Sequence, residues 1–152
     1  MKTVVLYSTR SGNTGKIAEA ISSELNCLSF KIDVHSKTST VNIEDFELVF
    51  LGTGILTGNP YRDLEQYIRS IDLKIPKIFV LFLTWGGAGK TNEIVATKLK
   101  TILENKGQKV IADVFKCYGA WKFSPLRRGH PDRGDIQAAK KWARDIITTV
   151  KS

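Results

Sequence analysis

Hydrophobic positions along the chain alternate between two spacings. Short apolar runs, such as Val4-Val5-Leu6 and 78–83, are typical of buried strands, whereas apolar residues that recur every three or four positions are typical of helices. These spacings predict strands over 2–7, 28–34, 48–51, 75–84 and 109–115. They predict helices over 14–25, from Pro60 through 71, across 94–103 to an end near Lys106 and Gly107, and across 136–150.

This order of elements predicts an α/β fold of one domain over residues 1–152. Five strand–helix units with no repeat and no linker indicate a parallel sheet covered by helices on both faces, a three-layer doubly wound sandwich. Ligands of such sheets bind beyond the carboxyl ends of the strands, where the strand order reverses. The loops 8–14, 52–59 and 84–89 each follow a strand and contain glycine. We expect all three to meet at one crevice if their strands are neighbours.

The first of these loops has the composition of an anion site. A strand that ends in small and hydroxyl residues and then starts a helix leaves backbone N–H groups unpaired at the positive end of the helix dipole. A phosphate is the usual ligand of such a turn. The alternative is that Ser11 or Asn13 only caps the helix. The residues that would form the phosphate site are Thr9, Arg10, Ser11, Gly12, Asn13 and Thr14.

Composition limits the function classes. No apolar run approaches the roughly 18 residues that cross a bilayer, and we expect a cytoplasmic protein without a signal peptide. Cys27 and Cys117 match no metal or redox spacing and are expected in the core. The formal net charge is +8, and residues 116–152 hold 9 Lys and Arg against 3 Asp and Glu. Such a region suits an acidic protein, anionic lipid or nucleic acid, unless it is only a solvated face.

Three other motifs are weaker. Residues 84–91 nearly match a phosphate-binding P-loop but have Thr84 where the pattern needs glycine, and 52–58 misses a dinucleotide fingerprint by one residue. The run 129–132 is expected to start the last helix; alternatively His130, Arg127 and Arg128 face the crevice or a partner. No set of residues has the spacing of a metal site or a hydrolytic triad, so no catalytic residue is predicted.

The first loop resembles the phosphate loop of flavodoxins, which reads (Ser/Thr)-x-(Ser/Thr)-Gly-x-Thr directly after the first strand. Here it is Thr9-Arg10-Ser11-Gly12-Asn13-Thr14, and the whole chain is similar in length and element order to short-chain flavodoxins. The resemblance implies the sheet order 2-1-3-4-5 and an FMN cofactor whose phosphate lies at 9–14. Its ring would lie between two further loops, formed by Thr53, Gly54, Ile55, Leu56, Thr57 and Gly58 and by Thr84, Trp85, Gly86 and Gly87.

The resemblance also implies chemistry for these loops. Flavodoxins reduce FMN one electron at a time, and a backbone carbonyl after the third strand turns to accept the hydrogen on the N5 atom of the half-reduced ring. The segment 56–58 is the expected position of that carbonyl, with Gly54 or Gly58 supplying the backbone freedom.

Several features depart from the flavodoxin pattern. Arg10 puts a charge inside the phosphate loop, where it either points to solvent or pairs with the phosphate. The loop after the third strand offers only Ile55 and Leu56 to the ring, so Trp85 is the expected aromatic contact. Tyr118 and Trp121 are not placed by the sequence. Flavodoxins are commonly acidic, so the basic charge of this chain should ease reduction of the ring.

The sequence therefore predicts a monomeric, FMN-binding one-electron carrier that docks to acidic faces of redox proteins, without binding nucleic acid. A second possibility is a flavoenzyme of the protoporphyrinogen oxidase or quinone reductase type, because Ser8-Thr9-Arg10-x-Gly12-x-Thr14 is also similar to the opening of those oxidases. A basic region would then suit a membrane surface. A third possibility is an interaction module on the same fold without flavin.

Overall fold

The computed structural model describes residues 1–33, 35–36, 41–120 and 127–152. In chain order the strands and helices are β1 (Thr3–Tyr7), α1 (Asn13–Leu25), β2 (Leu28–Lys31), β3 (Leu48–Leu56), β4 (Asn59–Pro60), α2 (Arg62–Ser70), β5 (Ile78–Trp85), α3 (Thr91–Asn105), β6 (Lys109–Val110), β7 (Phe115–Tyr118) and α4 (Arg133–Lys151). Helices follow β1, β4, β5 and β7, whereas β2 leads to β3 with no helix among the described residues, so four of the five predicted strand–helix units are present.

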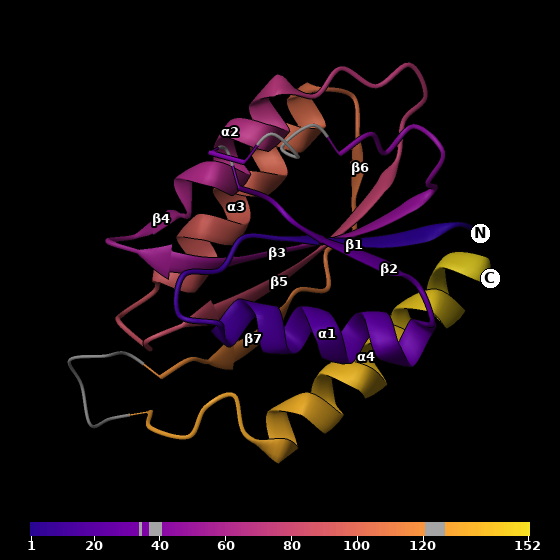
Figure 1. Ribbon diagram of the computed structural model, residues 1–152. Helices are drawn as coiled ribbons and strands as arrows, with labels where there is room; N and C mark the ends of the chain where they lie inside the picture. Colours follow the sequence, from indigo (N-terminus) through magenta and orange to yellow (C-terminus); the bar gives the residue numbers. More distant parts are fainter. Residues whose placement is uncertain (34, 37–40, 121–126) are drawn as a thin grey trace.

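The sheet is parallel in its main strands and has helices on both faces. The order of its strands is β2-β1-β3-β5-β6. β7 pairs with β5 on the same side as β6, further along β5, and so continues the last strand of the sheet. Helices α2 and α3 cover one face, and α1 and α4 cover the other (Figure 1). The predicted α/β fold and the strand order 2-1-3-4-5 are confirmed, with β6 and β7 together as the fifth strand.

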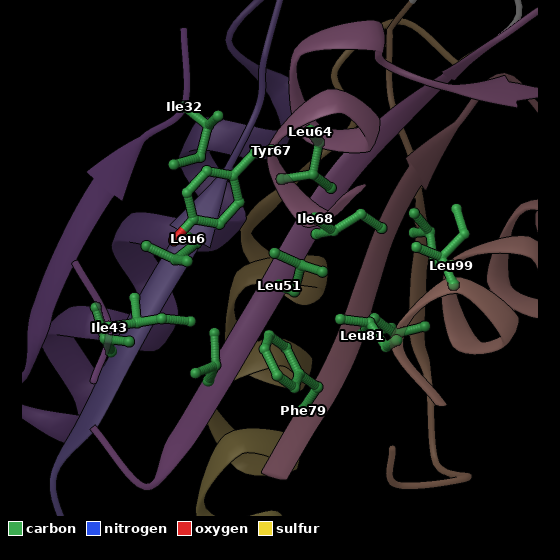
Figure 2. Close-up of a cluster of buried hydrophobic side chains, with 14 of the residues drawn as sticks. Leu6, Ile32, Ile43, Leu51, Leu64, Tyr67, Ile68, Phe79, Leu81 and Leu99 are labelled. Atoms are coloured by element: carbon green, nitrogen blue, oxygen red, sulfur yellow. The ribbon is translucent and has the colours of Figure 1, made fainter. Parts of the chain in front are cut away.

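Two apolar layers hold the helices to the sheet. Because successive side chains of a strand point to opposite faces, Val4 and Leu6 pack toward α2 and α3, whereas Val5 packs toward α1 and α4. Figure 2 shows the first layer, in which Leu51 and Leu81 of the central strands meet side chains from α2 and α3. Strands covered on both faces are apolar throughout, which explains the continuous hydrophobic runs.

The segment after β3 differs from the expected one. β3 does not stop at Leu51 but continues to Leu56, and the chain then reverses in a two-residue turn whose residues Thr57 and Gly58 both have positive φ. The following β4 pairs antiparallel with the end of β3, so that Pro60 lies opposite Ile55. The prediction that Pro60 opens the helix is therefore wrong. The hairpin forms instead because positive φ at both turn residues matches the twist of the two strands.

The last strand also differs from its predicted form. The expected strand 109–115 is interrupted after Val110, and pairing to β5 resumes at Phe115. Ala112 and Asp113 are exposed in the interruption, and aspartate is a poor strand residue because its side chain competes for backbone hydrogen bonds. The second part of this strand, β7, ends at Tyr118, which lies beside Trp85 at the carboxyl edge of the sheet.

Candidate functional site

The N-terminus of α1 is open. Gly12 is the N-cap residue with a φ of 89°, and no side chain caps the helix. The alternative that Ser11 or Asn13 serves as a cap is therefore not what the structure shows. The Asn13 side-chain amide donates instead to the carbonyl oxygen of Ala120 at 2.8 Å, and Thr9 Oγ1 accepts the Gly12 N–H at 3.1 Å. Among the described residues, no side chain therefore accepts a hydrogen bond from the first-turn amides of α1.

Thr14 connects this helix start to the neighbouring strand. Its side chain is buried, and its Oγ1 lies 2.7 Å from Oγ1 of Thr84 at the end of β5. A hydrogen bond between two buried hydroxyls fixes the distance between the first and third glycine-containing loops. The Thr14 side chain therefore ties the two loops together, and the prediction that Thr14 belongs to a phosphate site rests on its backbone N–H in the first turn of α1.

A cavity of about 450 Å³ opens beside this helix start. Its volume lies within the range of pockets that bind small molecules and cofactors. Five chain segments at the carboxyl edge of the sheet contribute to it, namely the start of α1, the start of α3, the β3–β4 hairpin with the residue after it, the end of β5, and the residues after β7. The lining residues are Ser11, Asn13, Ile55, Leu56, Thr57, Gly58, Tyr61, Thr84, Trp85, Gly86, Ala88, Thr91, Gly119 and Ala120.

The three loops expected to converge do so. Of the residues singled out from the sequence, those that line the cavity are Ser11, Asn13, Ile55, Leu56, Thr57, Gly58, Thr84, Trp85 and Gly86. The others lie behind or beside this lining, and they are Thr9, Arg10, Gly12, Thr14, Thr53, Gly54 and Gly87. The second group shapes the walls. The buried Thr53 hydroxyl, for example, accepts the N–H of Tyr61 at 2.9 Å and donates to the carbonyl of Gly54 at 2.8 Å.

Tyr61 is a lining aromatic that sequence reasoning missed. The expectation that the segment after the third strand offers only Ile55 and Leu56 to a bound ring is wrong, because the hairpin brings Tyr61 back over Gly54. A Cβ on Gly54 would lie 2.3 Å from the Tyr61 hydroxyl, so glycine is needed there for space. Gly54 has no positive φ, whereas Gly58 has a φ of 73°. Of the two glycines, Gly58 is therefore the one at a left-handed turn position.

Arg10 lies against this tyrosine. Its guanidinium carbon is 5.2 Å from the centroid of the Tyr61 ring, within the range of a cation–π contact. Burial raises the pKa of the Tyr61 hydroxyl, and the charge of Arg10 partly opposes that shift. Arg10 itself is exposed and is not among the lining residues of the cavity.

The opposite wall is a stack of planar side chains. Trp85 lines the cavity and stacks on Tyr118, with ring centroids 5.9 Å apart and planes inclined by 21°. The guanidinium carbon of Arg127 also lies over the Tyr118 ring, 3.6 Å from its centroid. Tyr118 therefore supports Trp85 and does not line the cavity. Trp121, the other aromatic residue considered for this loop, lies outside the described residues, as does Lys122.

The segment before α4 is a helix start, as expected. The side-chain carboxylate of Asp132 accepts a hydrogen bond from the backbone N–H of Asp135. The carboxylate of Asp135 accepts one from the backbone N–H of Asp132, and the two bonds form a capping box. His130 Nδ1 lies 2.7 Å from an oxygen of Asp135, and its ring meets the edge of Tyr118. His130 is not among the lining residues of the cavity. Its role is to join the capping box to the aromatic stack.

The cavity has little acid–base chemistry of its own. Among its described lining residues there is no histidine, cysteine, carboxylate, lysine or arginine, and Tyr61 is the one titratable side chain. The pKa of Tyr61 is raised, so its hydroxyl keeps its proton at neutral pH. The start of α1 contributes the polar side chains of Ser11 and Asn13, whereas Ile55, Leu56, Tyr61 and Trp85 contribute apolar or aromatic surfaces. This arrangement suits a flat molecule with an anionic tail.

Comparisons with known proteins agree with this geometry. The family model of the flavodoxin domain matches residues 4–143. An uncharacterised protein of Methanocaldococcus jannaschii is 30% identical over 97% of this chain and 99% of its own length. The flavodoxin-like domain-containing protein BilS of Clostridioides difficile is 31% identical over 97% of each chain.

Solved structures share the fold at lower identity. A flavodoxin from the domain Archaea superposes with a TM-score of 0.71 at 21% identity over the full length of both chains. Oxidised flavodoxin 1 of Bacillus cereus gives a TM-score of 0.74 at 17% identity, covering 97% of this chain and 98% of that one. In the described part of this chain, no helix has both the length and the apolar content needed to cross a bilayer.

Proposed function

Since the chain belongs to the flavodoxin family, we propose that it binds FMN and carries single electrons between redox proteins. One observation carries the proposal. The N-terminus of α1, which has no side-chain cap among the described residues, contributes to a cavity of about 450 Å³ that is also lined by the aromatic residues Tyr61 and Trp85.

The lining of the cavity offers contacts to both parts of FMN. The amides of the first turn of α1, with the side chain of Ser11, are hydrogen-bond donors for a phosphate at the positive end of the helix dipole. Trp85 and Tyr61 offer flat apolar surfaces to a ring, and Ile55 and Leu56 add aliphatic ones. The bound cofactor would supply the reversible one-electron chemistry, which the side chains themselves do not have.

The hairpin tip is the part of the site with backbone freedom. Gly58 permits a positive φ at no steric cost, so the peptide between Thr57 and Gly58 is the one best suited to reorient its carbonyl toward a bound ring. The side chain of Thr57 is exposed, so this reorientation disturbs no core contact. The chain thus offers an adjustable hydrogen-bond acceptor on a rigid sheet.

The absence of acid–base groups among the described lining residues favours a carrier over an enzyme. An enzyme that moves protons on its own substrate needs a positioned group with a pKa near the working pH. Tyr61 does not meet that need, because burial raises its pKa. An electron carrier needs only to hold the cofactor and to expose an edge of it.

A flavoenzyme on the same scaffold is the second candidate. The protoporphyrinogen IX dehydrogenase [quinone] of Escherichia coli is 31% identical over 71 residues, which cover 45% of this chain and 39% of that protein. Turnover of a porphyrinogen or a quinone by the purified holoprotein, without a protein partner, would favour this candidate and contradict a pure carrier.

FMN titration followed by flavin absorbance and fluorescence tests the proposal. Ser11→Asp places a carboxylate where the phosphate is expected, and we predict that it weakens FMN binding at least tenfold through like-charge repulsion. Ser23→Asp, an exposed position near the other end of the same helix, carries the same charge and should bind FMN like the wild type. Equal affinity in Ser11→Asp and Ser23→Asp would contradict a phosphate at the start of α1.

A further inference from the structure

The Trp85 wall of the cavity is backed by a cation. Trp85 and Tyr118 are register partners on the adjacent strands β5 and β7, so their side chains stand next to each other and stack. The guanidinium of Arg127 lies over the ring of Tyr118, its carbon 3.6 Å from the centroid. Of the three side chains, Trp85 alone lines the cavity.

Arg127 is held tightly in this position. A Cβ on Gly87 would come within 2.9 Å of Nη2 and 3.3 Å of Nε of Arg127, so the guanidinium is confined between the Tyr118 ring and the Gly87 backbone. Arg127 has a φ of 84°, a left-handed backbone conformation that residues with a side chain rarely adopt. The close contacts of the guanidinium therefore coincide with a strained backbone.

Among the described residues, the charge of Arg127 has no ion-pair partner. In the described part of the chain no carboxylate lies within ion-pair distance of Arg127, and its buried Nε has no hydrogen-bond partner there. A cation that is partly buried and unpaired is screened less by salt than an exposed one. Its field therefore extends through the aromatic wall into the cavity.

We infer that Arg127 makes this site prefer the reduced, anionic flavin ring over the oxidised, neutral ring. The inference rests on the proposed function, namely that FMN occupies the cavity with its ring against Trp85. The phosphate has the same charge in both oxidation states, so attraction between Arg127 and the phosphate cancels in the comparison. A unit charge about 10 Å from the ring, at an effective dielectric constant of about 20, changes the ratio of the two affinities about tenfold.

Arginine variants of the holoprotein test this role. Arg127→Gln keeps a planar side chain but removes the charge, and Arg127→Lys keeps the charge but removes the planar stack. Arg128→Gln removes the same charge from the neighbouring exposed position and is the matched control. For each protein, the dissociation constant of oxidised FMN and the two-electron midpoint potential together give the dissociation constant of the reduced form.

We expect Arg127→Gln to lower the preference for the reduced form about tenfold, equivalent to about 30 mV in the two-electron potential. Arg127→Lys should keep most of the preference, and Arg128→Gln should change it less than twofold because an exposed charge is screened. If Arg127→Gln does not fold, Arg127→Met removes the charge while retaining the aliphatic packing.

The possible failures are distinguishable. If the wild type does not bind FMN, both the proposed function and this inference are overturned. If the wild type binds FMN and Arg127→Gln has an unchanged preference, this inference alone is wrong. An equal loss in Arg127→Lys and Arg127→Gln would assign the effect to stacking and would overturn the role of the charge.

Discussion

At the scale of single residues, Thr57 occupies a position that does not suit threonine. It has a φ of 48° as the first residue of the hairpin turn, and Gly58 follows with 73°. Asn-Gly is the preferred pair for a turn with two positive φ values, because asparagine tolerates the left-handed region. We predict that Thr57→Asn raises the free energy of unfolding of the apoprotein by about 0.5–1 kcal/mol. The measurement is equilibrium unfolding in urea.

Thr101→Asn is the control for this substitution. Thr101 is exposed on α3, where the backbone is helical and asparagine brings no relief of strain. We expect its free energy of unfolding to stay within about 0.5 kcal/mol of the wild type. Equal effects of the two substitutions would show that the gain at Thr57 is not due to the turn.

Gly54 makes room for Tyr61, and this steric role is testable on its own. Because a Cβ at Gly54 would lie 2.3 Å from the Tyr61 ring and hydroxyl, Gly54→Ala must displace the ring. We predict a loss of about 1–3 kcal/mol of stability, typical of overpacking, together with weaker FMN binding. Gly86→Ala is the stability control, because nothing lies within 4 Å of a Cβ there and its φ is not positive.

A double-mutant cycle separates crowding from backbone effects at Gly54. If the glycine matters only because Tyr61 needs the space, adding Gly54→Ala to Tyr61→Ala should cost less than about 0.5 kcal/mol. A full cost of Gly54→Ala in the absence of the ring would instead indicate a backbone requirement in β3.

At the scale of elements, α4 begins with a reciprocal cap that depends on pH. The backbone N–H of Asp135 lowers the pKa of the Asp132 carboxyl from its ordinary 3.8, and His130 contributes in the same direction. A carboxyl whose pKa is lower in the folded state than in the unfolded state stabilises the fold at pH values above its unfolded-state pKa. This stabilisation is lost as the pH falls through the folded-state pKa. We predict that Asp132→Ala is less stable than the wild type at pH 7 and that the difference shrinks below about pH 4.

Thermal unfolding of wild type and variants across this pH range measures the effect. Asp132→Asn should lose less than Asp132→Ala at neutral pH, because asparagine is also a good N-cap residue. Asp113→Asn, an exposed position between β6 and β7, controls for removal of an aspartate outside a helix cap. A difference between Asp132→Ala and wild type that stays constant with pH would contradict the assigned role of the carboxylate.

The elements also show which parts of the site are predictable from sequence. Strands and helices can be predicted from the hydrophobic spacing, because burial against both faces of a sheet requires apolar residues at those spacings. Loops that follow parallel strands must gather at one edge of the sheet, so their convergence is also predictable. Tyr61 was missed because the Thr57-Gly58 turn lacks the usual asparagine, so Pro60 was read as a helix start. Gly119 and Ala120 were missed because they contribute mainly backbone, and the stack of Arg127 on Tyr118 depends on tertiary structure.

At the scale of the whole molecule, charge predicts the kind of partner. The chain carries +8, and exposed cations such as Arg62 and Lys90 flank the cavity-lining residues Tyr61 and Thr91. A surface of this kind accelerates encounter with a negatively charged partner, by 10- to 1,000-fold at low salt. We predict that the reduced holoprotein transfers electrons to an acidic cytochrome at least about tenfold faster at about 10 mM salt than at about 500 mM.

Charge-reversal variants locate the docking face. Arg62→Glu with Lys90→Glu should slow transfer at low salt far more than Lys109→Glu with Lys151→Glu, although both pairs change the net charge equally. Lys109 starts β6 and Lys151 ends α4, both away from the carboxyl edge of the sheet where the cavity lies. Stopped-flow rates at several salt concentrations decide between the two pairs. Equal slowing would mean that overall charge steers the encounter, whereas a larger loss at the cavity mouth requires that the partner approach the edge where the flavin is proposed to bind.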